Sequence, residues 1–508
     1  MGVNDGVLRQ LSTIAGAHVG NNTVSRPALD RIITASHARV PVPRNERSSR
    51  PPELCTAWLA LPASANVDVL VIGGGPAGSA AAIAAAREGA RTLLIEQFGF
   101  LGGMGTAALV PAWCPFTDRE KCIVRGLGLE ILEEMKSYMP HVARDHYDWV
   151  PIDAERLKVI YERRVLEAGA KILYLTHFVD VAPPDAGNVR SVIIHNKSGL
   201  QRIDAKVVVD CTGDADVAAA AGCAFDQGDP QTGECQPCTM CFILAGIDNR
   251  VLQPWLWADS ARNLLLRPAI AAAKVAGDLN IVEEAANVAY QSESTIGLNF
   301  SHVFDVDATN AEQLSAAMVE GRKLIRHLTE FVRKYLPGCE NAYLVHSGVQ
   351  IGVRESRRII GDYILTLDDY LARRSFPDEI ARNAYYIDIH LSKREWERSL
   401  GREIDWESKI HQYKPGESHG IPLRCLIPRD LRNMLVAGRC ISTDRAVQGS
   451  TRVMPNCLAM GEAAGCCGAM AAREHAGAVR YVSVAGLRAR LREHGAYLPD
   501  VDESPAGS

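Results

Sequence analysis

The sequence lacks a strong charge imbalance and a long apolar run, and both absences narrow what the protein can be. A net charge of −5 with a pI near 6.3 leaves no basic footprint for nucleic acid or an anionic lipid surface. No apolar stretch reaches the roughly 18–20 residues needed to span a membrane, so the Ala-rich run at 80–86 indicates a buried helix. Internal repeats are also missing, which argues against a repeat architecture. The content of 47% hydrophobic and 23% charged residues is typical of a soluble globular protein.

A disulfide framework is missing as well. The 14 cysteines are scattered along a long chain, which indicates reduced thiols and a cytoplasmic protein. Cys235, Cys238 and Cys241 have the C-x-x-C-x-x-C spacing of an iron–sulfur run. A fourth cysteine does not follow within three residues. Residues 239–247 have the pattern of a strand, whose alternate side chains point to opposite faces. We therefore expect packed thiols here and no metal.

The first 66 residues differ from the rest in composition. They contain several prolines and six arginines between Arg26 and Arg50, with little periodicity, so we expect residues 1–66 to form a disordered extension. The absence of an apolar segment near Met1 argues against a secretory signal. A mitochondrial transit peptide is the weaker alternative, because acidic residues such as Asp30 and Glu46 interrupt the basic character.

Residues 67–96 contain the most informative motif, VDVLVIGGGPAGSAAAIAAAREGARTLLIE. Residues 67–72 predict a buried parallel strand, and residues 73–78 fit G-x-G-x-x-G. An Ala-rich helix is expected from about Ala77 to Glu88, and a second strand, at 91–95, ends in Glu96. Strand, glycines, helix, strand and acid within one unit form a dinucleotide-binding fingerprint.

Each part of this unit has a physical role in binding a dinucleotide. Gly73 allows the tight turn, Gly75 lets a pyrophosphate approach the backbone, and Gly78 lets the helix pack close to the strand. The helix N-terminus offers unpaired N–H groups and a positive dipole end to the phosphates. Glu96, 23 residues after Gly73, is placed to accept hydrogen bonds from ribose hydroxyls.

The remaining pattern predicts how the chain is divided. A helix is expected at 153–169, followed by a meander of short β segments that returns to the nucleotide sheet. The expected segments are 171–175, 178–182, 189–195 and 201–209. We expect an α/β fold, in which a Rossmann-like domain with a parallel sheet and a β-meander carries an inserted α+β substrate domain. The predicted divisions are an extension at 1–66, the nucleotide-binding domain at 67–225 and 421–480, the insertion at 226–420, and a helix with a loose tail at 481–508.

Six segments in this order resemble the FAD-dependent oxidoreductases of the glutathione-reductase-like flavoprotein superfamily. The resemblance spans about 67–475, and the group is distantly related to fumarate-reductase-type flavoproteins and to the flavoprotein of heterodisulfide reductase. The segments are VIGGGPAGSAAAIAAAREGARTLLIE, FGFLGGMGT, VVVDCTGDADVAAAAG, IGVRESRRIIGDY, IPLRCLIPRDLRNMLVAGRCIS and STRVMPNCLAMGEAAG. The resemblance implies an enzyme with FAD as cofactor.

The resemblance also implies which residues contact FAD. They sit at the pyrophosphate, the adenosine, the flavin-side loop, the returning strands and the final helix, whose N–H groups are expected at the electron-rich flavin edge. They are Gly73, Gly75, Pro76, Ala77, Gly78, Glu96, Gly102, Gly103, Met104, Thr106, Val179 (adenine), Thr212, Gly213, Asp214, Gly438, Arg439, Gly461, Ala463 and Ala464. Related families with covalent flavin have a His near the double glycine; Met104 stands there in this chain, so non-covalent FAD is expected.

Candidate catalytic residues lie where the insertion is expected to close over the flavin. His390 and His419 are candidates for proton transfer. Arg354 and Arg452 are candidates for anchoring a substrate carboxylate or the electron-rich flavin edge, and a solvated helix face is the alternative for Arg354. His302 and His346 are weaker candidates.

The function expected from these features is hydride transfer between a small organic substrate and flavin N5. Only one dinucleotide fingerprint is present, which argues against a separate NAD(P)H domain. The alternatives are an FAD monooxygenase, and a structural or regulatory subunit that binds flavin without turnover; polar groups converging near N5 would favour an enzyme. The electron acceptor and the formation of a homo-oligomer stay open.

Overall fold

The computed structural model describes residues 58, 61, 63–258, 265–398 and 413–499. Most of the expected extension at 1–66, and the last residues of the expected tail, therefore lie outside the described residues. Within the described ranges, none of the helices is long and apolar enough to cross a membrane.

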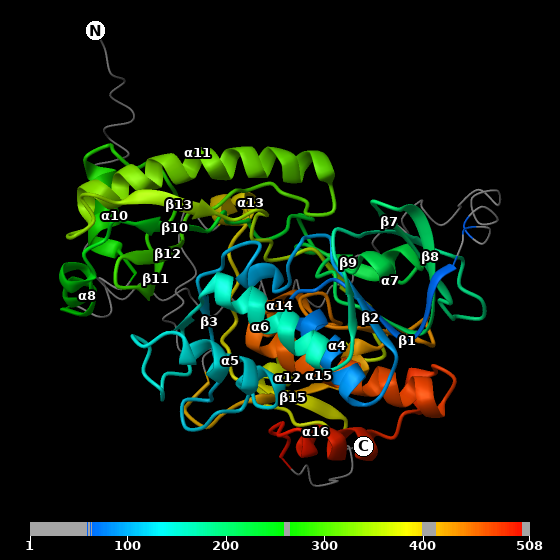
Figure 1. Cartoon of the computed structure of the whole chain (residues 1–508). Helices are drawn as coiled ribbons and strands as arrows, with labels where there is room; N and C mark the ends of the chain where they lie inside the picture. The colour runs from blue at the N-terminus through cyan, green and yellow to red at the C-terminus, as the bar shows by residue number, and fades with distance from the viewer. Residues whose placement is uncertain (1–57, 59–60, 62, 259–264, 399–412, 500–508) are drawn as a thin grey trace.

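A seven-stranded, mainly parallel sheet forms the centre of the larger domain (Figure 1). Its strand order is β5-β2-β1-β8-β7-β6, and β17 pairs with β8. The pairs β5–β2, β2–β1, β1–β8 and β8–β17 are parallel, whereas β6, β7 and β8 form the antiparallel meander. The strands are β1 (Ala63–Ile72), β2 (Thr92–Ile95), β5 (Lys171–Leu173), β6 (His177–Val181), β7 (Ser191–Asn196), β8 (Gly199–Asp210) and β17 (Met434–Val436). This arrangement confirms the predicted Rossmann-like sheet with a meander.

One predicted meander strand has a different place. The segment at 171–175 forms β5, which pairs with β2 at the parallel edge of the sheet instead of joining the meander. Helix α6 (Ala154–Glu167) precedes β5, and a helical crossover returns the chain in the parallel direction.

Side chains of β1 alternate between two apolar cores. Val69 and Val71 belong to the core that contains α4 (Pro76–Arg87), and Leu70 and Ile72 belong to the core that contains α7 (Asp216–Ala220). Successive strand residues point to opposite faces, and both faces of this sheet are covered. The continuous apolar run at 69–72 follows from that double coverage.

Helices α4 and α15 (Met454–Glu474) pack with their backbones in close contact. A Cβ on Gly461 would lie 2.0 Å from the carbonyl oxygen of Ala77, and a Cβ on Gly465 would lie 2.2 Å from that of Ala81. Residues 76–85 of α4 are all buried, since small side chains let the neighbouring helix and the sheet approach from every side. These small residues fix the position of α4, whose N-terminus faces the cavity described below.

The smaller domain is built on a four-stranded antiparallel sheet with the order β11-β12-β10-β13. Helix α11 lies along the outer side of this domain (Figure 1), and its Asn310 N-cap side chain accepts hydrogen bonds from the N–H groups of Glu312 and Gln313. The elements are β10 (Phe242–Ala245), α8 (Asn249–Ala258), α10 (Arg267–Val275), β11 (Asn287–Ser292), β12 (Thr295–Asn299), α11 (Ala311–Tyr335) and β13 (Tyr343–Ser347).

The apolar cores divide the chain differently from the predicted insertion at 226–420. The core of the smaller domain is drawn from residues 238–353, whereas Leu365, Tyr370 and Ile380 pack in the core of the larger domain. The second half of the predicted insertion therefore returns to the larger domain, and we propose an insertion of about 229–356. The returning and connecting elements are β3 (Ala112–Trp113), α5 (Leu127–Ser137), β4 (Val150–Pro151), β9 (Phe225–Gln227), β14 (Arg357–Ile359), α12 (Leu367–Leu371), β15 (Glu379–Asn383), α13 (Lys393–Arg398), β16 (His419–Pro422), α14 (Arg445–Thr451) and α16 (Val484–Glu493).

Candidate functional site

A cavity of about 2620 Å³ is lined by residues of both domains. Pockets for a single small ligand usually measure about 300–1,000 Å³. The volume therefore leaves room for a dinucleotide and a second molecule.

The first glycine turn forms one wall of this cavity. Gly73 has φ +93°, and a Cβ there would lie 2.5 Å from the carbonyl oxygen of Cys211. A Cβ on Gly78 would lie 1.7 Å from the carbonyl oxygen of Gly73, so only glycine allows this approach of helix to strand. A Cβ on Gly75 would meet only the Cα of Gly103, at 3.9 Å, among the described residues, so it would occupy the open space in front of the helix.

The N-terminus of α4 is suited to an anion. Its N-cap residue is Gly75, without a side-chain cap, and Pro76 occupies the first turn. The next N–H groups have no helical acceptor, and the helix dipole adds positive potential. Gly75, Pro76 and Ala77 all line the cavity. The residues present therefore fit a pyrophosphate at this turn.

Glu96 lies at the end of β2, where the fingerprint predicts it. Its carboxylate accepts hydrogen bonds from the N–H of Gly74 at 2.6 Å and from the N–H of Phe98 at 2.8 Å. Burial raises its pKa, although these N–H groups oppose that effect. Each carboxylate oxygen has a second lone pair, so Glu96 can still accept from a ribose hydroxyl. Val179, the predicted adenine contact, lines the same cavity.

The double-glycine loop meets the first turn. Gly102 has φ +109° and Gly103 has φ +50°, and a Cβ on Gly103 would lie 2.9 Å from the Cα of Gly75. Met104 follows and lines the cavity. Thr106 does not line it: its hydroxyl donates to the carbonyl oxygen of Leu101 at 2.7 Å and is buried under Gly102. The loop therefore brings Gly103 and Met104 to the cavity, while Gly102 and Thr106 shape it from behind.

Asp210, at the end of β8, fixes the conformation of the glycine turn at residues 212–214. Its side chain accepts hydrogen bonds from the N–H of Thr212 at 3.0 Å and from the hydroxyl of Thr212 at 2.7 Å. It also accepts from the N–H groups of Val217 and Ala218, both at 2.9 Å. This cap of α7 fixes the turn through which Thr212, Gly213 and Asp214 reach the cavity.

Arg439 joins this turn to the polypeptide of the smaller domain. Its Nε donates to the carbonyl oxygen of Gly213 at 2.9 Å, and Nη2 lies 2.5 Å from Oδ1 of Asp214. Nη1 donates to the carbonyl oxygen of Val353. Gly438, with φ +105°, turns the chain before Arg439, and both residues line the cavity.

The resemblance implies that Gly461, Ala463 and Ala464 stand at the start of the final helix, and the structure shows an earlier start. Helix α15 begins at Met454, so Gly461, Ala463 and Ala464 lie in its second and third turns and do not line the cavity. The reason is the contact of Gly461 with Ala77: the small residues pack the helix against α4. Met454 at the true N-terminus lines the cavity instead.

A polar cluster forms another part of the cavity wall. His390 Nε2 lies 3.3 Å from Asp388 Oδ1, and Arg452 Nη2 lies 3.1 Å from Asp388 Oδ2. The hydroxyl of Tyr385 donates to Asp388 Oδ2 at 3.2 Å. Burial alone would raise the pKa of Asp388, but His390, Arg452 and Arg354 together hold it well below its usual range. Asp388 is therefore a carboxylate shared among these neighbours.

His390 is neutral in this setting. Burial, and then the charge of Arg354, lower the pKa of His390 to about 3, against the opposite effect of Asp388. His302 lies next to it, with 4.9 Å between ring centroids, and its Nδ1 lies 2.9 Å from Glu283 Oε1. Burial lowers the pKa of His302 as well. His302, the weaker candidate in the sequence, therefore lines the cavity beside the cluster.

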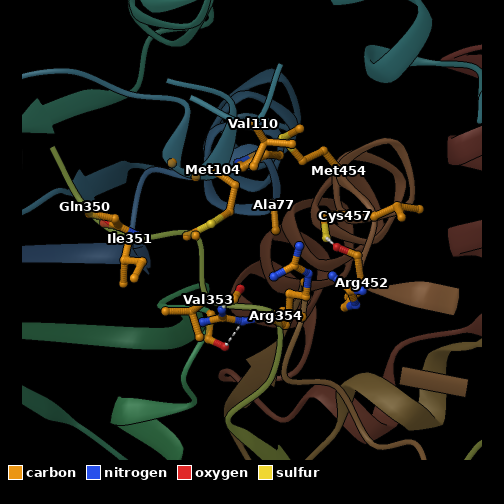
Figure 2. A pocket seen from close by; sticks show the side chains of 18 of the residues that line it. Ala77, Met104, Val110, Gln350, Ile351, Val353, Arg354, Arg452, Met454 and Cys457 are labelled. Carbon is orange, nitrogen blue, oxygen red and sulfur yellow. Dashed lines mark hydrogen bonds between the residues drawn. The ribbon is translucent and has the colours of Figure 1, made fainter. Parts of the chain in front are cut away.

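Arg354 is anchored by neutral oxygens of the smaller domain. Its Nη1 donates to the carbonyl oxygen of Pro237 and to the hydroxyl of Thr239, both at 2.8 Å. Nη2 donates to Oδ1 of Asn299 at 3.3 Å. Figure 2 shows Arg354 and Arg452 in the same part of the cavity. The predicted alternative of a solvated helix face does not apply, because Arg354 is 8% exposed and lies outside any helix.

His419 lies apart from the cluster. It is fully buried in β16, where Nδ1 lies 2.8 Å from the hydroxyl of Tyr413 and the ring packs against Tyr370. Burial, and then the charge of Arg382, lower the pKa of His419 to about 3. His419 does not line the cavity, so we propose a packing role for it.

Two thiols of the cysteine run, Cys238 and Cys241, are buried, and Cys235 is half-buried. Cys238 packs in the core of the smaller domain, and Cys241 packs against Leu109 and Ala154. In the part of the chain that the structure describes, the one group of side chains with metal-ligand spacing is Glu88, Cys466 and His494, which lies away from this run.

The predicted site residues thus fall into two groups. Those that line the cavity are Gly73, Gly75, Pro76, Ala77, Glu96, Gly103, Met104, Val179, Thr212, Gly213, Asp214, Gly438, Arg439, Arg354, Arg452 and His390. Those placed elsewhere are Gly78, Gly102, Thr106, Gly461, Ala463, Ala464 and His419.

Sequence reasoning missed Asp388 and Tyr385. The signal that was available is the segment YYIDIH, in which Asp388 and His390 lie on one side of an extended stretch because alternate residues share a side.

Comparison with known proteins agrees with this geometry. A family model described as "FAD dependent oxidoreductase" matches residues 68–491. The thiamine thiazole synthase of Aeropyrum pernix is 33% identical over 158 residues, which are 29% of this chain and 54% of that protein. The thiamine thiazole synthase of Sulfolobus acidocaldarius is 31% identical over 165 residues, 30% of this chain and 58% of that protein. The chain thus spans little more than half the length of these curated relatives.

Solved structures are similar at low sequence identity. A geranylgeranyl bacteriochlorophyll reductase-like protein from Thermoplasma acidophilum is 12% identical, with a TM-score of 0.39, and the match covers 84% of this chain and 82% of the other. A p-nitrophenol 4-monooxygenase from Pseudomonas putida is 13% identical, with a TM-score of 0.33, over 59% of this chain and 70% of the other.

Proposed function

Because the chain belongs to the FAD-dependent oxidoreductase family, we propose that it transfers a hydride between a small organic substrate and bound FAD. The observation that carries this proposal is that one cavity joins the dinucleotide turn at Gly73 and Gly75 to the cluster of Arg354, Asp388 and His390. A flavin-binding scaffold without turnover needs no such cluster.

The residues that would hold FAD follow from the geometry above. The first turn of α4 and Gly103 would bind the pyrophosphate, and Glu96 would bind the adenosine ribose. When bound, FAD supplies a flavin ring that accepts or donates a hydride. Met104, Val110 and Met454 line the part of the cavity shown in Figure 2, and their apolar side chains would help to exclude water from a bound flavin.

His390 and Asp388 would handle the proton that accompanies this transfer. An ionised Asp388 accepts from Nε2–H of His390, and this hydrogen bond fixes the tautomer. Nδ1 then carries the lone pair and would accept a proton from the substrate. A neutral imidazole is the form that this role requires, and burial of His390 favours it.

The purified protein should be yellow, and acid precipitation should release FAD into the supernatant, because no His stands beside the double glycine. Flavin retained by the precipitate would contradict non-covalent binding. FMN in place of FAD would contradict the assignment of Glu96 to the adenosine ribose.

The test of turnover is anaerobic mixing with panels of reduced and unsaturated small molecules, followed by the flavin absorbance. Substrates that bleach or restore the flavin should do so about 10²- to 10⁴-fold more slowly in His390→Gln, which removes the proton acceptor. The matched control is His346→Gln, because His346 is exposed on β13. Equal rates in the two variants would contradict the role of His390.

A further inference from the structure

The arginines of the cavity wall differ in how their charge is balanced. Arg439 lies 2.5 Å from Asp214, and Arg357 lies 2.8 Å from Asp216, so each has its own carboxylate. Arg354 has no carboxylate oxygen within 4.0 Å of its nitrogens in the described ranges 63–258, 265–398 and 413–499, where its hydrogen bonds go to neutral oxygens. Neutral oxygens satisfy the N–H groups but leave the positive charge in a buried setting, which is strongly unfavourable.

Arg452 is also incompletely satisfied. Its Nη2 bonds both the carbonyl oxygen and the carboxylate of Asp388, at 3.0 and 3.1 Å. Its Nε is buried without a hydrogen-bond partner among the described residues. Buried polar atoms rarely stay unpaired in folded proteins, so the described residues leave Arg452, which lines the cavity, with hydrogen-bonding capacity to spare.

The two guanidinium groups are close enough to repel each other. Burial, and then the charge of Arg452, lower the pKa of Arg354. Among the described residues, Asp388 is the one carboxylate within 4.0 Å of either guanidinium, and it bonds Arg452. Glu283 also lines the cavity, but it pairs with His302, so a bound anion would give Arg354 the close charged partner that it lacks.

We propose that Arg354 and Arg452 together bind the carboxylate of an organic-acid substrate, which rests on the proposed function. The carbon part of that substrate would lie toward the apolar side chains of Met104, Val110, Ile351 and Met454, which line the same cavity (Figure 2). A guanidinium presents paired donors that match the two oxygens of a carboxylate. His390 stands beside the same two arginines, within reach of a bound acid.

The test uses the FAD-loaded protein and three carboxylates, butanoate, benzoate and succinate, each with its matching amide at fixed ionic strength. Binding is followed by the flavin difference spectrum and, independently, by the shift in melting temperature. At least one carboxylate should bind saturably and its amide at least about 10-fold more weakly. Arg354→Gln should weaken that carboxylate about 10- to 100-fold while FAD stays bound.

Two further variants distinguish loss of the binding group from damage to the fold. Arg354→Lys keeps the charge and should recover part of the affinity, and Arg250→Gln, at a side chain that is 92% exposed, should change nothing. Inorganic phosphate is the third arm: if it binds as tightly as the best carboxylate, the site takes anions in general, and the carboxylate assignment is overturned.

The remaining outcomes also decide the matter. If no carboxylate binds better than its amide, or if Arg354→Gln keeps full affinity, the proposal is wrong. If Arg354→Gln instead shifts the flavin reduction potential and leaves carboxylate binding intact, Arg354 interacts with the flavin and not with the substrate, and the proposal is wrong. A protein purified without flavin would contradict the proposed function, whereas the melting-temperature arm would still report on the acid site.

Discussion

At the scale of single residues, Glu96 has both a structural and a binding role. Its carboxylate accepts from Gly74 and Phe98, so it holds the first glycine turn in shape besides facing the cavity. Glu96→Gln should weaken FAD binding about 10- to 100-fold, because a charge-assisted hydrogen bond contributes about 1.5–3 kcal/mol. Glu96→Ala should also lower the free energy of unfolding by about 1–3 kcal/mol, since two buried N–H groups lose their acceptor.

Flavin fluorescence during FAD titration, and urea unfolding without FAD, measure these two effects separately. An alanine variant as stable as the wild type would contradict the structural role. Equal FAD affinity in both variants and the wild type would contradict the binding role.

His419 gives a pH dependence with a defined sign. Its pKa is about 3 in the folded protein and about 6.5 when unfolded, so the unfolded chain binds a proton first. The stability that the neutral ring contributes is present above pH 6.5 and is lost as the pH falls toward 3. The free energy of unfolding should therefore fall more steeply on acidification than in His419→Gln, by at most about 1.4 kcal/mol per pH unit.

Urea titrations of both proteins at pH 7, 6, 5 and 4 measure that difference. His419 is suited to the test because it lies outside the cavity, so the comparison does not depend on ligands. Parallel pH profiles would show that the ring is protonated in the folded state.

At the scale of elements, the contact between α4 and α15 decides where the cavity wall stands. A Cβ at Gly461 would collide with the carbonyl oxygen of Ala77 at 2.0 Å, whereas a Cβ at Gly468 would meet Val207 at 3.4 Å, an ordinary contact. Gly461→Ala should lower the free energy of unfolding by about 1–3 kcal/mol or more, because the helices must separate. Gly468→Ala should be neutral or raise it by up to about 1 kcal/mol, as glycine is a poor helix former.

Thermal or urea unfolding of the two variants makes this comparison within one helix. Gly461→Ala should also reduce FAD retention on gel filtration, since α4 carries the pyrophosphate turn. Equal stability of the two variants would contradict the close packing.

The elements that sequence reasoning predicted best are those with strict local rules. The unit from β1 to Glu96 was predicted within a few residues, because its glycines are required by positive φ or close approach, as at Gly73 and Gly78. The start of α15 was missed because Gly461 looked like a helix N-terminus, whereas its small size serves helix packing. Asp388 was missed because Arg452, the charged partner that lies 64 residues away in the sequence, becomes its neighbour only through a tertiary contact.

At the scale of the whole molecule, the cavity lies between two apolar cores that belong to different domains. A ligand that fills it contacts both, and any ligand bound only by the folded state adds stability. FAD at about 100 times its Kd should add about 2.7 kcal/mol to the free energy of unfolding, and its removal should lower the melting temperature correspondingly. Calorimetry of the flavin-free and FAD-loaded protein measures this difference in stability. A melting temperature that does not change with FAD concentration would contradict the prediction.

The division into domains could be predicted only in part. The inserted sheet was expected, since residues 226–420 carry no dinucleotide motif. We propose an earlier C-terminal limit than residue 420, because Leu365 and Tyr370 pack in the core of the larger domain, and their apolar character alone does not indicate which core receives them. The core in which such a segment packs is determined by its contacts with segments that are distant in the sequence. These contacts depend on residues throughout the chain.

The position of Arg439 has a consequence for the binding of the acid. One guanidinium bonds Gly213 beside the cofactor region and Val353, the residue that precedes Arg354. Gly213 and Arg439 line the cavity, so a cofactor bound there would restrain this turn and, through the bond to Val353, the backbone next to Arg354. We therefore expect the acid to bind the flavin-free protein more weakly than the FAD-loaded protein, because only the loaded protein holds its site in the binding geometry beforehand.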